Sequence, residues 1–290
     1  MTNLVKTAIF PMAGYGTRFL PITKIVEKEL LPILDRPLID YVVEEAKNAG
    51  IEKFIFVKSP NRSNAEKYFT KNFNLENYLT NNDRYHLIEK ITSMELESDA
   101  IVTVEQKLPL GLGHAIWCAR EHINEEFFAV MLPDDLVVGN IPCIKELINT
   151  NNKTNGNVLA VMEVPNQDIP KYGIIDVLSE SGKLVEVNGL IEKPALDMAP
   201  SNLAIIGRYI LNKNIFEMID YNNSNGNIEI QLTDAIASTI DTLPLHGFKF
   251  SGRRFDCGHV LGALQASVAI SLMRKDLQHD AKNIISNEIN

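Results

Sequence analysis

Short apolar segments alternate with helical patterns through the first half of the chain. The runs at 4–10, 53–57, 101–104 and 127–132 are rich in β-branched and aromatic residues, as buried strands are. Between the first two runs, apolar residues recur at helical spacing over 38–49, and Gly50 follows as a helix-ending glycine. Strands that alternate with helices predict right-handed βαβ units, and therefore an α/β fold with a mixed, mostly parallel central sheet flanked by helices.

The second half has a different pattern. Strand-like segments at 157–164, 173–177, 183–187 and 203–211 follow one another with little helix between them. We expect them to form an antiparallel, β-rich lobe laid over the active edge of the sheet. Helical patterns return at 229–240 and 259–273, on either side of a strand at 245–250. In the last helix we expect the apolar residues to pack in the core, with a subunit contact as the alternative; they include Val260, Leu264, Val268 and Ile270.

Neither a Pro/Ser-rich linker nor an internal repeat divides the sequence, so we expect one domain over residues 1–290 with an inserted lobe. The formal charge of −9 argues against general binding to nucleic acid or to an anionic membrane, because both require a basic surface. No stretch approaches the length of a membrane span. Three widely separated cysteines without a CxxC pair are typical of reduced thiols in a cytoplasmic protein.

A glycine-rich segment, Ala13-Gly14-Tyr15-Gly16-Thr17-Arg18, directly follows the first strand. Two glycines two residues apart allow a backbone turn with positive φ, which brings N–H groups close to a phosphate chain. The arginine adds a bidentate fork for phosphate oxygens. A dinucleotide-binding fingerprint is excluded because Phe19 stands at its third glycine position, and no P-loop sequence occurs. A plain glycine-rich turn remains the alternative.

Two further segments follow predicted strands. Gln106 begins QKLPLGLGHA, in which Gly111 precedes a helix, and its amide suits the imide face of uracil. Asp134 and Asp135 end the apolar run at 127–132, where α/β sheets bind their ligands and where carboxylates suit Mg²⁺. A strand-to-helix turn and a helix cap are the respective alternatives. We expect Asp135 to be a cap. We treat His114 as structural, because the sequence offers it no partner.

Glycine and charged residues punctuate the β-rich part. Gly173 opens one predicted strand, and Glu192 and Lys193 precede Pro194 at the end of another. On an extended chain the two charged side chains point in opposite directions, and we expect a backbone bend at Pro194 to bring them together. A solvated surface turn is the alternative. We assign the segment at 229–235 mainly to structure, with a capping role for one of its polar residues.

The glycine-rich segment continues as Gly16-Thr17-Arg18-Phe19-Leu20-Pro21, Thr23-Lys24 and Lys28-Glu29-Leu30-Leu31-Pro32. This run resembles the GxGTRxxPxT and PKxxxP signature of the sugar-phosphate nucleotidyltransferases. The resemblance extends to about Gly262 and is closest to the bacterial UTP–glucose-1-phosphate uridylyltransferases. Glu27 replaces the family proline before Lys28, which places loop geometry and nucleotide affinity in question. Residues 71–99 and the tail after Lys275 are not usefully matched.

The resemblance implies a Rossmann-like nucleotidyltransferase fold, with a nucleotide-binding part at about 1–140 and a sugar-binding part at about 157–260. It implies a reaction of UTP with glucose 1-phosphate that yields UDP-glucose and pyrophosphate, with Mg²⁺ on Asp134 and Asp256. Arg18, Lys28 and Lys193 would be catalytic. The remaining implied contacts are to nucleotide, from Ala13, Gly14, Gly16, Thr17, Gln106 and Gly111, and to sugar phosphate, from Gly173, Glu192 and Lys193.

The family resemblance also implies a homo-oligomer, either a dimer or a tetramer, and a role in supplying UDP-glucose for envelope polysaccharides and galactose metabolism. Three alternatives remain open at this stage. They are a different nucleotide specificity such as thymidylyl transfer, a catalytically weak regulatory paralogue that binds sugar nucleotide, and a glycosyltransferase. The intact Thr17-Arg18 argues against the regulatory paralogue, whereas Glu27 keeps it open.

Overall fold

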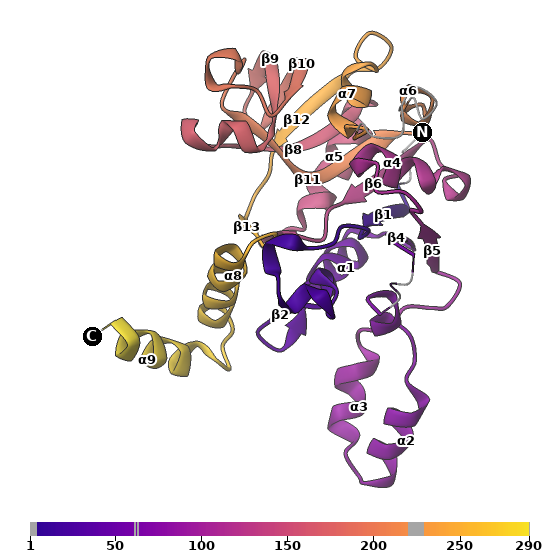
Figure 1. Cartoon of the computed structure of the whole chain (residues 1–290), viewed down its shortest axis with the longest axis vertical. Helices are drawn as coiled ribbons and strands as arrows, with labels where there is room; N and C mark the ends of the chain where they lie inside the picture. Colours follow the sequence, from indigo (N-terminus) through magenta and orange to yellow (C-terminus); the bar gives the residue numbers. More distant parts are fainter. Residues whose placement is uncertain (1–4, 61, 63, 220–228, 290) are drawn as a thin grey trace.

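One mixed sheet of nine strands forms the centre of the protein (Figure 1). The computed structural model describes residues 5–60, 62, 64–219 and 229–289. The strands of this sheet lie in the order β5-β4-β1-β6-β11-β8-β12-β10-β9. Their bounds are β1 (Thr7–Pro11), β4 (Lys53–Lys58), β5 (Ile101–Glu105), β6 (Phe127–Met131), β8 (Asn157–Glu163), β9 (Gly173–Ser181), β10 (Leu184–Glu192), β11 (Leu203–Asn212) and β12 (Leu245–Lys249).

The four strands from the first half of the chain are parallel, which confirms the α/β prediction. β1 pairs in parallel with β4 and with β6, and β4 pairs in parallel with β5. The carboxyl ends of these strands therefore meet at one edge of the sheet. The glycine-rich loop follows β1, Gln106 follows β5, and Asp134 lies just after β6, so this edge gathers segments from three separate parts of the chain.

The strands of the second half extend the same sheet. β11 is antiparallel to β6 and β8, and β10 is antiparallel to β12 and β9, while β12 is parallel to β8. The expectation that these strands lie over the sheet is wrong in this detail, since they continue its hydrogen-bond ladder. β9 also runs farther than predicted, to Ser181. The prediction stopped short because the outer half of the strand is exposed and lacks a continuous apolar pattern.

Helices cover both faces of the sheet. The α-helices are α1 (Leu38–Ala49), α2 (Phe73–Asn81), α3 (Tyr85–Thr92), α4 (Gly111–Cys118), α5 (Cys143–Thr154), α6 (Ile215–Met218), α7 (Leu232–Ala237), α8 (Val260–Met273) and α9 (Gln278–Ile289). Short strands are β2 (Pro32–Ile33), β3 (Arg36–Pro37), β7 (Asp135–Val138) and β13 (Arg253–Asp256). The 3₁₀ turns are η1 (Thr17–Phe19), η2 (Ile22–Lys24), η3 (Lys28–Leu30), η4 (Glu66–Phe69), η5 (Arg120–His122), η6 (Asn166–Lys171) and η7 (Leu196–Met198). Figure 1 shows α2 and α3 as a projecting hairpin. Within the described residues, no helix is both long and apolar enough to cross a bilayer.

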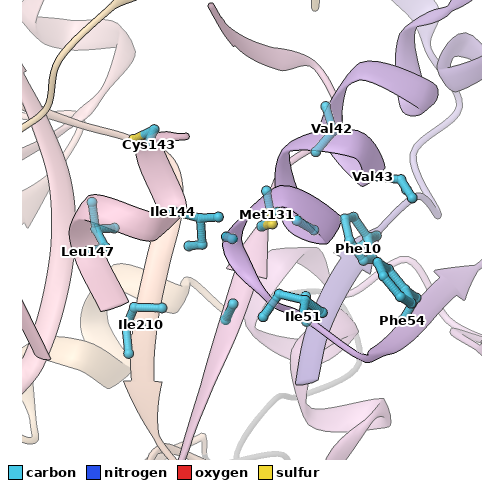
Figure 2. Close-up of a cluster of buried hydrophobic side chains, with 14 of the residues drawn as sticks. Phe10, Val42, Val43, Ile51, Phe54, Met131, Cys143, Ile144, Leu147 and Ile210 are labelled. Carbon is cyan, nitrogen blue, oxygen red and sulfur yellow. The ribbon is translucent and has the colours of Figure 1, made fainter. Parts of the chain in front are cut away.

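The main core lies between the sheet and the helices α1 and α5. Figure 2 shows Val42 and Val43 of α1 and Ile144 of α5 among side chains of the sheet such as Phe10 and Met131. α1 forms because its apolar residues recur on one face, and it ends at Gly50, whose φ of 98° is suited to glycine. A second cluster covers the opposite face, where α4 and α7 pack. This packing on both faces fixes the sheet edge that carries the candidate site.

The last long helix is less buried than the sequence predicts. In α8, Val260, Leu264 and Val268 are 57%, 58% and 36% exposed, whereas Ile270 is buried as expected. The helix is apolar around most of its circumference, and only the side with Ala266, Ala269 and Ile270 packs against the body of the protein. Apolar spacing does not reveal which side of such a helix has a partner, so the core prediction is wrong for the other three residues.

Candidate active site

The glycine-rich loop packs against the segment of residues 23–28, which ends at Lys28. Gly16 has a φ of 66°, and a Cβ there would lie 3.0 Å from atoms of both Lys28 and Thr23. Thr23 Oγ1 donates to the Gly16 carbonyl over 2.8 Å. Arg62, which sequence reasoning missed, donates to the Gly14 carbonyl over 3.2 Å. Glycine is therefore required at position 16 by both backbone conformation and space.

Lys28 reaches Asp134 at the carboxyl edge of the sheet, with 2.7 Å between Nζ and Oδ2. Burial would lower the pKa of Lys28, but the charges of Asp134 and Glu29 outweigh it and raise that pKa. Burial would likewise raise the pKa of Asp134, but Lys28 holds it below its usual value. The two groups are therefore an ammonium and a carboxylate at neutral pH.

Glu27 points away from the glycine-rich loop. Its side chain is buried, and its two oxygens accept hydrogen bonds from the backbone N–H groups of Asn64 and Ala65 at 3.1 and 3.2 Å. Glu27, which replaces the family proline, therefore links the segment of residues 23–28 to the backbone at Asn64 and Ala65. It adds no carboxylate to the side of the loop where phosphates would lie.

Asp134, Asp256 and Arg18 converge on Gly258. A Cβ atom at Gly258 would lie 3.0 Å from Asp256 Oδ1, 3.2 Å from Asp134 Oδ2 and 3.4 Å from Arg18 Nη1. No group of three or more metal-ligating side chains occurs in the described part of the chain. Mg²⁺ commonly takes only one or two carboxylates and completes its shell with water and substrate phosphates. The two aspartates fit an ion of that kind.

Asp135 has a different position from the helix cap that the sequence predicts. It begins β7, and its oxygens accept from the backbone N–H of Gly207 at 2.8 Å and from Arg254 Nε at 2.5 Å. Arg254 also donates to the Tyr172 hydroxyl over 2.8 Å. Sequence reasoning missed Arg254, although strand alternation places it on the same face of β13 as Asp256.

Gln106, just after β5, contacts Gly111, the first residue of α4. Gln106 is buried, and its Nε2 donates to the Gly111 carbonyl over 3.0 Å. Gly111 has a φ of 90°, and a Cβ there would lie 2.3 Å from Glu229 Cγ. The Ile230 N–H donates to the Leu110 carbonyl over 2.8 Å, and the Ile230 carbonyl accepts from the Gly113 N–H over 2.9 Å. The segment at 229–233, assigned to structure from the sequence, thus forms a wall of the site.

Glu192 and Lys193 are brought together by the backbone of Lys193 itself. Its φ is +45°, and its Nζ lies 3.2 Å from Glu192 Oε1. The bend therefore lies one residue before the expected position at Pro194. A Cβ at Gly173 would lie 3.1 Å from Glu192 Oε2, so glycine there admits the carboxylate.

Thr233 holds the other side of this carboxylate. Its hydroxyl donates to Glu192 Oε2 over 2.7 Å. The expected cap in this segment is wrong, because Gln231 precedes α7 without a side-chain hydrogen bond to the helix. The contact joins residues 41 positions apart, and no sequence pattern indicates it.

Two adjoining cavities connect these groups. The larger, of about 860 Å³, extends from Gln106 and Gly111 past the glycine loop to Asp134. The smaller, of about 240 Å³, is lined by Glu192 and Lys193, and Arg18 and Asp134 line both cavities. The site can therefore hold two anionic molecules whose charged ends meet beside Asp134.

Comparisons with known proteins identify the family of the chain. The family model described as nucleotidyl transferase matches residues 8–271. The UTP–glucose-1-phosphate uridylyltransferase of Komagataeibacter xylinus is 44% identical over 89% of this chain and 91% of its own length. The solved structure of UTP-bound UGPase from Acinetobacter baumannii has a TM-score of 0.90 and 38% identity, covering 97% of this chain and 99% of that one.

A solved UDP-glucose pyrophosphorylase in complex with UDP-glucose has a TM-score of 0.81 and 39% identity, with 93% of this chain and 100% of that one covered. These similarities extend over nearly the whole sequence, including the residues of both cavities. By fold and sequence, the chain belongs to the nucleotidyl transferase family of enzymes.

Proposed function

We propose that the protein transfers the uridylyl group of UTP to glucose 1-phosphate, which yields UDP-glucose and pyrophosphate. The observation that carries this proposal is the shared wall of the two cavities, where Arg18 and Asp134 line both. One cavity accommodates a nucleoside triphosphate and the other a sugar phosphate, with their phosphates adjacent. The relatives named for this activity, and the similar structures named for bound UTP and UDP-glucose, support the same assignment.

The larger cavity orients the nucleotide. Gln106 and Gly111 would contact uracil at its inner end, and the backbone of the loop that contains Ala13, Gly14, Gly16 and Thr17 would hold the phosphates. Arg18 and Lys28 supply positive charge beside the same loop. These two groups would stabilise the pyrophosphate as it leaves.

The smaller cavity orients the sugar phosphate. Glu192 would accept hydrogen bonds from sugar hydroxyls beside Gly173, and Lys193 would bind the phosphate. A phosphate oxygen of glucose 1-phosphate then forms a bond to the α-phosphorus of UTP. The bond from that phosphorus to the oxygen of the β-phosphate breaks, and pyrophosphate leaves with the electron pair. The protein contributes position and charge to this exchange, without a covalent intermediate.

Asp134 and Asp256 would hold Mg²⁺, which when bound supplies positive charge to neutralise the phosphates. Lys28 keeps Asp134 ionised, as a metal ligand must be. We further propose one catalytic domain over residues 1–290, in which about 1–140 binds nucleotide and about 157–260 binds sugar. The exposed apolar side of α8 supports a homo-oligomer, a dimer or a tetramer.

The test is pyrophosphate release by the purified protein with Mg²⁺ and glucose 1-phosphate, with UTP compared with dTTP, ATP, CTP and GTP. We expect a strong preference for UTP and loss of activity in EDTA. Lys193→Ala should lose most turnover, whereas Lys213→Ala, at an exposed lysine outside both cavities, should not. Folded protein that binds UDP-glucose but turns over no nucleotide would refute the proposal and favour a regulatory paralogue.

A further inference from the structure

The amide nitrogen of Gln106 faces two acceptors. Nε2 lies 3.0 Å from the Gly111 carbonyl and 3.0 Å from Nδ1 of His114. Both side chains are buried, with Gln106 5% and His114 4% exposed. A carbonyl only accepts, so the group beside the Gly111 carbonyl must be the amide NH₂ and not the amide oxygen. The position of the amide is thus set by the protein before any nucleotide binds.

The same constraint fixes the tautomer of His114. Because the amide nitrogen only donates, Nδ1 of His114 must accept, and the ring proton lies on Nε2. Nε2 faces Cys118 Sγ at 3.6 Å, one helical turn farther along α4. Burial lowers the pKa of His114, against a hydrogen bond with the backbone of Leu108 that raises it, so the ring is neutral at neutral pH. A neutral ring with an unprotonated Nδ1 is the form that the Gln106 amide requires.

The carbonyl oxygen of Gln106 is left for the ligand. Within the described part of the chain, Oε1 makes no hydrogen bond, and Gln106 lines the larger cavity. An oxygen held in this way accepts from a base that presents a ring N–H, as the imide N3–H of uracil does. In cytosine the same ring nitrogen carries a lone pair, which would face the oxygen lone pairs.

We propose that His114 is a positioning residue that fixes the amide orientation of Gln106, so that the site selects imide bases over cytosine. If the amide turned by 180°, Oε1 would face both the Gly111 carbonyl and Nδ1 of His114. His114, together with the Gly111 carbonyl, thus prevents the orientation that would accommodate the cytosine ring nitrogen. The inference rests on the proposed use of UTP and adds the group that enforces the choice of base.

The experiment compares His114→Phe, which keeps a ring but removes the acceptor, with His114→Asn, whose side-chain oxygen replaces Nδ1 as an acceptor. The kcat/KM values for UTP, CTP and dTTP are measured with glucose 1-phosphate. For His114→Phe we expect the UTP-to-CTP ratio to fall up to about tenfold, as expected for the loss of one buried hydrogen-bond constraint while the Gly111 carbonyl remains. His114→Asn should retain the ratio of the unaltered protein.

Thymine has the same imide group as uracil, so the UTP-to-dTTP ratio should stay constant in both variants. A general loss of packing would lower all three values together and leave the UTP-to-CTP ratio unchanged, and that result would overturn the inference. If the phenylalanine variant does not fold, His114→Leu replaces it. Absence of turnover by the unaltered protein would refute the proposed function. In that case the ratio of the equilibrium dissociation constants for UTP and CTP, compared between the unaltered protein and the His114 variants, tests His114 separately.

Discussion

Removal of Arg208 should destabilise the protein more than almost any other single substitution of a charged residue. Its guanidinium is fully buried in β11, where Nε lies 3.1 and 3.2 Å from the two oxygens of Glu45 and Nη2 lies 2.7 Å from one of them. Nη1 donates to the Leu132 carbonyl over 3.0 Å, two residues before Asp134. The pair therefore joins α1 to the loop that carries the proposed metal ligand.

Arg208→Met would leave the carboxylate of Glu45 buried, and among the described residues the backbone N–H of Ile144, at 3.0 Å, would be its one remaining hydrogen-bond partner. Loss of one member of a buried ion pair typically costs about 3–5 kcal/mol. With about 2.1 cal/mol/K of unfolding entropy per residue, 290 residues give about 0.6 kcal/mol/K. The expected fall in Tm is therefore about 5–8 °C.

Thermal unfolding followed by circular dichroism or calorimetry measures this shift. Arg84→Met, at an exposed arginine of the α2–α3 hairpin, is the matched control and should leave Tm nearly unchanged. A double variant, Glu45→Leu with Arg208→Met, should recover most of the loss, because no buried charge remains, although Ile144 loses its acceptor. If Arg208→Met melted within about 1 °C of the unaltered protein, the reasoning that Glu45 is left uncompensated would be refuted.

Three further predictions concern the site. Asp134→Asn should lower turnover about a hundredfold or more while the protein stays folded, measured by pyrophosphate release and thermal unfolding. Glu27→Ala should cost about 1–2 kcal/mol in urea unfolding, because it leaves two backbone N–H groups without an acceptor, whereas Glu27→Gln should cost less; equal costs would argue against the two hydrogen bonds. Burial raises the pKa of Glu29 from 4.5 to about 7, so the stability it contributes is present below pH 4.5 and lost as pH rises through about 7. Glu29→Gln should remove this loss from unfolding curves measured between pH 5 and 8.

The parts of the site that the sequence predicts are those that follow strands. Gly14, Gln106 and Asp134 come from segments far apart in the chain, yet each follows a predicted parallel strand. Parallel strands have their carboxyl ends on one edge, so three local patterns were sufficient to place these residues near one another. The fold class was predictable because the strands β1, β4 and β6 are buried on both faces, so their sequences are continuous apolar segments.

Contacts between segments far apart in the chain follow no such rule. The Asp135–Arg254 pair joins residues 119 positions apart, and Thr233 reaches Glu192 across 41 positions. Each of these side chains had a plausible local role, as a cap or as a surface charge, and nothing in its sequence neighbourhood favours the actual one. Their roles depend on how elements that are distant in the sequence meet in the fold.

Lys193 shows why the sequence rule fails at the site itself. Alternation along a strand predicts that Glu192 and Lys193 point apart, and the left-handed backbone of Lys193 reverses this at a cost of about 1–2 kcal/mol. The conformation persists because the Lys193 N–H donates to the Tyr172 carbonyl over 3.0 Å and Pro194 disfavours the right-handed helical alternative. The surrounding fold thus stabilises a backbone that a lysine would not adopt alone. Local propensity therefore misleads at this residue because the fold places a carboxylate and an ammonium on the same cavity, as the proposed recognition of a sugar phosphate requires.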